Sequence, residues 1–362
     1  MKQESLFTDF LSGIRIADKS EYIEAHKTLR SRLKKDPTLG SHIVHTFLQG
    51  SYRRHTAISP DTGEKADIDV VIVTDFAEGS YTPKEVIELF VPFLEEHYKG
   101  LWDDDQARSI GITLGDLKMD MVVTSDPTVA KAVQRGSVKF SESDFDDFFD
   151  EDDRFGFTFF SRVELSEKGW QPTSLRIPDR NAEKWIDTDP ITQILWTRQM
   201  NKDTGGHYVN AVKALKWWKR GQADLPKHPK GYPLEHIIGA NCPSNITSVA
   251  EGVCKTLRAI VDSYGSDVLL GQTPVLLDHG VNQNVLLRIK AADFKAFYEA
   301  VEEAADAAEA AYKEQDPAES WRKWYAFFGA PFPEPKEDYA KSLSGIGALR
   351  ASSGDTERKR HA

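Results

Sequence analysis

The sequence has little cysteine and no long apolar run, and each absence excludes a class of protein. Cys242 and Cys254 are the only cysteines among 362 residues, which excludes a disulfide-stapled scaffold and fits a reducing compartment. No apolar run approaches the roughly 20 residues that a transmembrane helix needs. The first residues lack the cationic and apolar parts of a signal peptide. We therefore expect a cytoplasmic protein with no membrane partner.

A surplus of basic residues is also missing. The formal net charge is −11, whereas proteins that grip a polynucleotide carry a basic surplus for phosphate contacts. His236, Cys242 and Cys254 are too few and too irregularly spaced for a zinc site. The sequence thus favours a small phosphorylated ligand over a long nucleic acid.

The hydrophobic pattern predicts an α+β protein. Residues 4–35 have apolar positions at helical spacing, and residues 82–100 read as one amphipathic helix. Between and after them lie short apolar runs with β-branched bias, such as "DIDVVIV", "RSIGITL" and "LKMDMVV", which predict a mixed sheet. The second half of the chain is mostly helical.

Two lobes and a tail follow from this pattern. We expect a mixed-sheet lobe with N-terminal helices over 1–175, a helical lobe over 176–330, and a C-terminal segment with a flexible tail over 331–362. The acidic stretch 141–153, "SESDFDDFFDEDD", matches no ligand loop and is interpreted as a solvated surface loop.

Three carboxylates lie on predicted neighbouring strands. Asp67 and Asp69 point to one face of their strand, about 6–7 Å apart along the backbone. Asp120 is a polar residue within the apolar strand "LKMDMVV". Like charges so close are unfavourable unless a cation lies between them, and divalent metals prefer oxygen ligands. Three such carboxylates would hold two Mg²⁺ ions about 4 Å apart; the alternative is a pair of exposed aspartates at a strand start.

A Gly-Ser pair precedes the first of these strands. Gly50 allows backbone amides to approach a ligand closely, and Ser51 offers an amide and a hydroxyl to a phosphate. Arg53 or Arg54 would add a cation. The pair is a weak signal alone and a strong one when followed by Asp-x-Asp and a third strand aspartate.

Together these motifs resemble the signature of the DNA polymerase β-like nucleotidyltransferases. The segments "NAVKALKWWKR" and "KGYPLEHII" resemble paired helical motifs of the branch that contains oligoadenylate synthase and cyclic GMP–AMP synthase. The chain is most similar to the bacterial cyclic-oligonucleotide synthases of anti-phage signalling operons, over about residues 10–330. The resemblance implies a bilobal polymerase β-like fold.

The resemblance also implies roles for individual residues. Asp67, Asp69 and Asp120 match the Mg²⁺-binding acids, with Asp120 as the base, and Mn²⁺ is expected to substitute for Mg²⁺. Gly50 and Ser51 match the positions that hold the triphosphate of the donor nucleotide.

The helical lobe supplies two further matches. Lys216 matches a lysine on the same triphosphate, and Tyr232 matches an aromatic that stacks on the donor base. Lys216 shares one helix face with Lys213 and Arg220, which alternatively form a solvated face. Glu235 and His236 are interpreted as residues that stabilise the helix or its packing.

The implied function is synthesis of a cyclic di- or trinucleotide from ATP and other NTPs, with release of pyrophosphate. Partners are then the NTPs, a downstream effector that binds the product, and a regulatory or conjugating protein at the tail. Direct activation by DNA is not expected, since no zinc cluster is present. The alternatives are another polymerase β-like transferase that modifies RNA ends, proteins or drugs, or a non-catalytic nucleotide sensor.

Overall fold

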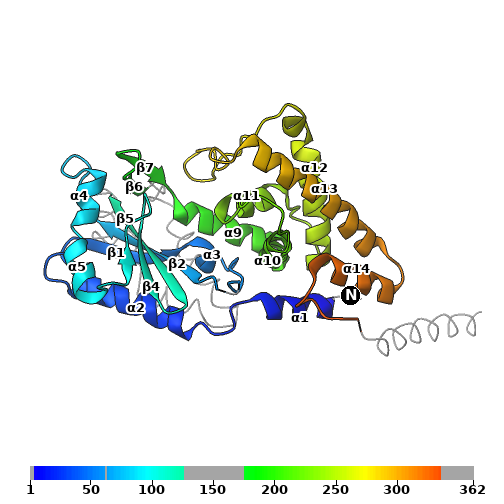
Figure 1. Ribbon diagram of the computed structural model, residues 1–362, viewed down its shortest axis with the longest axis horizontal. Helices are drawn as coiled ribbons and strands as arrows, with labels where there is room; N and C mark the ends of the chain where they lie inside the picture. Colours follow the sequence, from blue (N-terminus) through cyan, green and yellow to red (C-terminus); the bar gives the residue numbers. More distant parts are fainter. Residues whose placement is uncertain (1–3, 62, 126–174, 336–362) are drawn as a thin grey trace, which may run out of the picture.

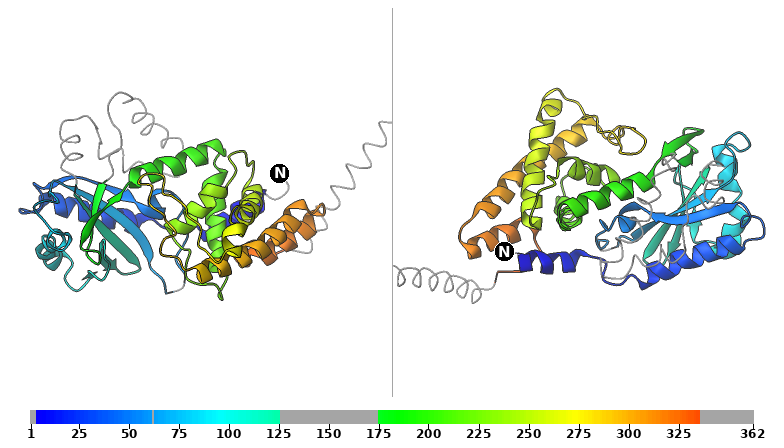
Figure 2. Two further views of the ribbon diagram at one scale, coloured as in Figure 1. Left: turned by 90° about the horizontal axis from the view of Figure 1, so that it is seen from above. Right: turned by 180° about the vertical axis from the view of Figure 1, so that it is seen from behind.

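The computed structural model describes residues 4–61, 63–125 and 175–335. The acidic stretch 141–153 and the predicted tail after residue 335 lie outside the described residues. Figure 1 shows a sheet-containing part and a helical part side by side, and Figure 2 shows the same division from above and from behind.

One seven-stranded sheet forms from the part of the chain that the structure describes. Its strand order is β1-β2-β5-β4-β3, and the hairpin of β6 and β7 is attached through β5. Only β2 and β5 pair in parallel among these strands, so the predicted mixed sheet is confirmed. The strands are β1 (Ile43–Gln49), β2 (Ala66–Thr74), β3 (Trp102–Asp103), β4 (Ile110–Leu114), β5 (Leu117–Ser125), β6 (Leu175–Asp179) and β7 (Lys184–Thr188).

Helices cover the sheet and bury its apolar residues. Leu29 and Leu33 of α2 (Ser20–Lys35) pack in one core with the strand residues Ile68 and Met119. The predicted single helix over 82–100 is instead two helices, α4 (Pro83–Glu88) and α5 (Val91–His97). Pro92 explains the break, because proline has no N–H to donate to the preceding turn. The short α3 (Gly50–Arg53) follows β1 directly.

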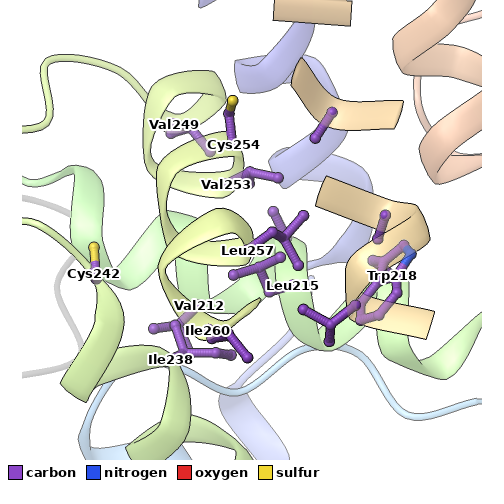
Figure 3. Close-up of a cluster of buried hydrophobic side chains, with 14 of the residues drawn as sticks. Val212, Leu215, Trp218, Ile238, Cys242, Val249, Val253, Cys254, Leu257 and Ile260 are labelled. Atoms are coloured by element: carbon purple, nitrogen blue, oxygen red, sulfur yellow. The ribbon is translucent and has the colours of Figure 1, made fainter. Parts of the chain in front are cut away.

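A second core lies among the helices after the sheet (Figure 3). Leu215 of α10 and Leu257 of α12 meet in it, and Ala304 and Ala308 allow α13 to pack closely on its neighbours. The helices are α9 (Pro190–Asp203), α10 (His207–Arg220), α11 (Tyr232–Asn241), α12 (Val249–Leu269), α13 (Ala291–Lys313) and α14 (Pro317–Phe328). Within the described ranges, no helix is long and apolar enough to cross a membrane.

Two segments pack against the lobe to which the sequence did not assign them, given the predicted boundary after residue 175. Helix α1 (Glu4–Ile14), assigned with the sheet lobe, buries Phe7 and Phe10 in the helical core, where Phe7 lies edge-on to Trp324. The β6–β7 hairpin, assigned to the helical lobe, hydrogen-bonds to the sheet at Ser125. The aromatic residues of α1 pack against residues more than 300 positions later in the chain, and the sequence gives no sign of these contacts. The lobe boundaries themselves remain a prediction.

Helix α9 packs against the sheet and against the helical core. Its Ile194 is buried with Phe47 and Val71 of the sheet, while Trp196 lies edge-on to Tyr208 of α10. The contact with the sheet fixes one end of the helical lobe beside β1 and β2 (Figure 1).

Candidate active site

The three aspartates meet on adjacent strands. In the parallel register of β2 and β5, Asp69 lies opposite Asp120 and Asp67 lies opposite Lys118. Because paired residues of neighbouring strands point to the same face, all three carboxylates lie on one face of the sheet. Asp120 is buried, Asp69 is half-buried and Asp67 is exposed. The structure therefore brings together the residues that the sequence pattern selected.

These carboxylates raise one another's pKa. Desolvation, followed by repulsion from Asp67 and Asp120, raises the pKa of Asp69 to about 7. Desolvation and the charge of Asp120 raise the pKa of Asp67 to about 6. Lys118 acts in the opposite direction on both. The shift is smaller at Asp67, as expected of the more exposed residue, and burial contributes more to both shifts than repulsion does.

Asp120 is held in place by its neighbours. Its Oδ1 accepts a hydrogen bond of 2.8 Å from Nε2 of Gln106 and lies 3.3 Å from Nζ of Lys118. Gln106 is oriented in turn, since its Oε1 accepts a hydrogen bond from the Ser109 hydroxyl. Sequence reasoning did not single out Gln106, because a glutamine in a polar loop gives no signal.

The donor set fits a divalent cation. In the described ranges no three His, Cys, Asp or Glu side chains are already gathered as a metal-binding group, and Asp120 turns one oxygen toward Gln106 and Lys118. Nevertheless, carboxylate oxygens are the ligands that Mg²⁺ prefers. Burial, and then mutual repulsion, raise the pKa values of Asp67 and Asp69, and a bound cation would offset both effects.

Gly50 provides the space in which Asp69 lies. A Cβ atom at residue 50 would be 1.8 Å from Oδ2 of Asp69, and the φ angle of Gly50 is +75°. Both the contact and the left-handed backbone require glycine. The pairing of Gln49 with Asp69 in the antiparallel β1–β2 ladder brings the two together. Ser51 follows in α3, and its carbonyl accepts hydrogen bonds from the amides of Thr56 and Ala57.

Lys216 and Arg54 lie together, joined by Glu235. Nζ of Lys216 is 2.9 Å from Oε1 of Glu235 and also donates to the carbonyl of Thr56. Arg54 donates from Nε to Oε2 of Glu235 at 3.1 Å. The family resemblance implied a triphosphate role for Lys216, and the Gly-Ser motif suggested Arg53 or Arg54 as a further cation. The structure brings Lys216 and Arg54 together with a carboxylate in the first turn of α11.

Tyr232 lies beside this group. The Arg54 guanidinium is 5.1 Å from the centre of the Tyr232 ring, and the Tyr232 hydroxyl donates a 2.7 Å hydrogen bond to Oδ2 of Asp278. Gln193 donates to the same oxygen. Asp278 was missed because it lies in a loop 46 residues further along the chain, without any motif. Glu235 was interpreted only as a packing residue, although a charged residue within "YPLEHII" is itself a signal of a buried ion pair.

Comparisons with known proteins identify the family of the chain. Residues 1–144 match the Second Messenger Oligonucleotide or Dinucleotide Synthetase domain. A cyclic AMP-AMP-GMP synthase of Enterobacter hormaechei and a probable cyclic AMP-AMP-GMP nucleotide synthase of Salmonella paratyphi B are each 37% identical over 355 residues. In both cases the match covers 92% of this chain and 93% of the relative. The chain belongs to this family of bacterial cyclic-oligonucleotide synthases.

Solved structures show the same fold. Escherichia coli CdnC with ATP has a TM-score of 0.60 at 15% identity, covering 91% of this chain and 99% of CdnC. CdnC in a complex with HORMA-deltaN gives a TM-score of 0.59 at 14% identity, with 91% and 98% covered. These structures confirm the predicted bilobal α+β fold. The relatives of 37% identity confirm the predicted family and, with it, a nucleotidyltransferase enzyme.

Replacing Gly50 tests the close approach to Asp69. We expect Gly50→Ala to destabilise the protein by about 2–4 kcal/mol, because the methyl group adds an overlap to the backbone strain. Gly100→Ala is a matched control: Gly100 has a φ of +72° but open space around its Cβ position, so only the strain, roughly 1 kcal/mol, should appear. Chemical denaturation measures both, and equal losses would contradict the steric role of Gly50.

The repulsion among the carboxylates predicts an unusual pH dependence. The folded-state pKa of Asp69, about 7, exceeds its unfolded value, so ionisation costs the native state stability as pH rises from about 4 to 7. In EDTA at pH 8 we expect Asp69→Asn to be more stable than wild type by on the order of 2 kcal/mol. The difference should shrink toward pH 5, where Asp69 of the wild type is itself protonated.

Thermal unfolding over this pH range measures the effect. Asp262→Asn, on an exposed face of α12, serves as the control and should change little. An Asp69→Asn variant less stable than wild type at pH 8 would show that ionised Asp69 does not destabilise the native state.

Proposed function

We propose that the chain joins ATP and GTP into a cyclic trinucleotide of two adenylates and one guanylate. The observation that carries the proposal is the 37% identity, over 92% of the chain, to synthases named for that product. Cyclic oligonucleotide synthesis is the activity of the family. The proposal adds that each product contains one guanylate and that the ring has three nucleotides.

In each step a hydroxyl of one nucleotide attacks the α-phosphorus of a donor NTP. A new P–O bond forms, the bond to the β-phosphate oxygen breaks, and pyrophosphate leaves. Asp120 would accept the hydroxyl proton, and its fixed contacts with Gln106 and Lys118 favour a constant orientation. Mg²⁺ ions held by Asp67, Asp69 and Asp120 would neutralise phosphate charge and activate the hydroxyl.

The remaining residues would position the donor. Ser51 and the cations Arg54 and Lys216 would contact the triphosphate, and Tyr232 would stack on the base. The hydrogen bond from Tyr232 to Asp278 and the contact with Arg54 support this role, because they hold the ring in one orientation. After two additions the linear product would turn in the site and close by the same chemistry.

The biological setting is part of the proposal. The cyclic product would act as a second messenger for an effector protein in bacterial anti-phage defence. A regulatory protein would act on the synthase, with the C-terminal tail as one candidate attachment point.

Removal of the paired carboxylates tests the chemistry. We expect Asp67→Asn with Asp69→Asn to lower pyrophosphate release from NTPs and Mg²⁺ by at least about a hundredfold, since charge neutralisation at the phosphates is lost. Asp75→Asn is the control, because Asp75 lies just beyond the other end of β2 and pairs with His42. Turnover by the double variant near the wild-type rate would exclude these carboxylates from catalysis.

Product analysis tests the proposed nucleotide composition. With all four NTPs and Mg²⁺, we expect a phosphatase-resistant product whose mass is that of two AMP and one GMP residues less three waters. Omitting GTP should abolish this product. A product of different composition would contradict the proposed use of ATP and GTP. Transfer of a labelled nucleotide to an RNA end or to a protein would favour the alternative transferases.

A further inference from the structure

Glu235 makes an unusually complete set of polar contacts for a fully buried carboxylate. Oε2 accepts hydrogen bonds from Nε of Arg54 at 3.1 Å and from the Thr56 hydroxyl at 2.8 Å. Oε1 accepts from Nζ of Lys216 at 2.9 Å. Only 4% of Glu235 is exposed, so these three groups replace water around it.

The charges in this cluster do not cancel. Burial would raise the pKa of Glu235, but the adjacent Arg54 and Lys216 lower it to about 2, so the carboxylate is ionised at neutral pH. Two cations therefore share one anion. Arg54 also interacts electrostatically with Asp69, whose pKa it lowers against the larger opposing effects of burial and Asp67. The cluster thus extends from Lys216 to the predicted metal-binding end of β2.

The cluster also joins the two parts of the fold. Arg54 and Thr56 follow α3 beside the sheet, whereas Lys216 belongs to α10 and Glu235 to α11. Nζ of Lys216 additionally donates to the Thr56 carbonyl at 2.9 Å, so two hydrogen bonds fix its ammonium group across this junction.

We propose that Glu235 is a positioning residue that holds Lys216 and Arg54 in the geometry in which they bind the donor triphosphate. The inference rests on the proposed function, which assigns the triphosphate to these two cations. One carboxylate between two cations leaves a net positive charge for the ligand. Glu235 also holds both long side chains in place before the nucleotide binds. Lys216 and Arg54 therefore lose less conformational entropy on binding than free side chains would.

A purely structural ion cluster is the competing explanation. It would stabilise the fold without changing what Lys216 contributes to nucleotide affinity. The two explanations differ in the energetic coupling between Glu235 and Lys216 when nucleotide binds, which a double-mutant cycle measures directly.

The experiment compares four full-length proteins: wild type, Lys216→Met, Glu235→Gln and the double variant. Calorimetry gives the Kd of a non-hydrolysable ATP analogue with Mg²⁺ for each. In the wild-type background we expect Lys216→Met to weaken binding roughly tenfold, as for loss of one charged contact, and in the Glu235→Gln background by about threefold or less. Such a difference supports positioning.

Two other outcomes overturn the inference. Equal effects of Lys216→Met in both backgrounds mean that Glu235 is only structural. A larger effect in the Glu235→Gln background means that Glu235 competes with the triphosphate for Lys216 instead of presenting it.

A matched control separates positioning from stability. Glu251 is also a buried carboxylate, which accepts hydrogen bonds from Thr247 and pairs with Lys255 on α12. Glu251→Gln should lower stability and leave the effect of Lys216→Met on Kd unchanged. If Glu235→Gln does not fold, Thr56→Val removes one hydrogen bond to Glu235 without changing any charge, and it should also reduce the effect of Lys216→Met.

Failure of this inference is distinct from failure of the proposed function. The binding cycle needs no turnover, while pyrophosphate release and product mass from the same wild-type preparation test the synthase reaction. A wild-type protein that binds no nucleotide would overturn both.

Discussion

The close approach of Asp69 to Gly50 is the constraint on which the site depends. The Asp69 carboxylate occupies the space where any other residue at position 50 would place its Cβ. Antiparallel pairing of β1 with β2 and parallel pairing of β2 with β5 are both needed to create this contact and to set Asp120 opposite Asp69. A shift of one residue between β2 and β5 would turn Asp69 to the face opposite Asp120, and a shift between β1 and β2 would move Gly50 away from Asp69. The apolar remainder of β2, buried on both faces, makes such a shift costly.

The polar cluster around Glu235 has a different effect on the fold. A buried ion group contributes little net stability, because desolvation offsets most of the attraction between the charges. It does demand one arrangement of the sheet part and the helical part, since Arg54, Lys216 and Glu235 come from three separate elements. Apolar packing of α9 against the sheet holds the two parts together, and the ion cluster specifies how they meet.

Local patterns made most of the fold and the three carboxylates predictable. Alternation and β-branched runs identify β2 and β5, and helical spacing identifies α2 and α10, because these signals lie within a few residues. The features that the sequence did not predict depend on contacts between residues far apart in the chain. Arg54 and Glu235 are 181 residues apart, and the aromatic partners of Phe7 lie near the far end of the described chain. No periodicity encodes such pairings. Asp278 lies in a loop, where the sequence does not indicate which residue the side chain will contact.

Because Arg54 and Lys216 are largely buried, we expect the site to favour a small phosphorylated ligand over a long nucleic acid. The net charge of −11 disfavours close approach of a polyanion, and salt screens this repulsion beyond about 8–10 Å. Arg53 and Arg54 are each only 6% exposed, so they cannot line the outside of a duplex, where phosphates are regularly spaced. A compact anion that comes in beside Ser51 would meet Arg54 and Lys216 at short range, where desolvation strengthens the attraction. Buried cations within an acidic chain would therefore favour a small, highly charged ligand.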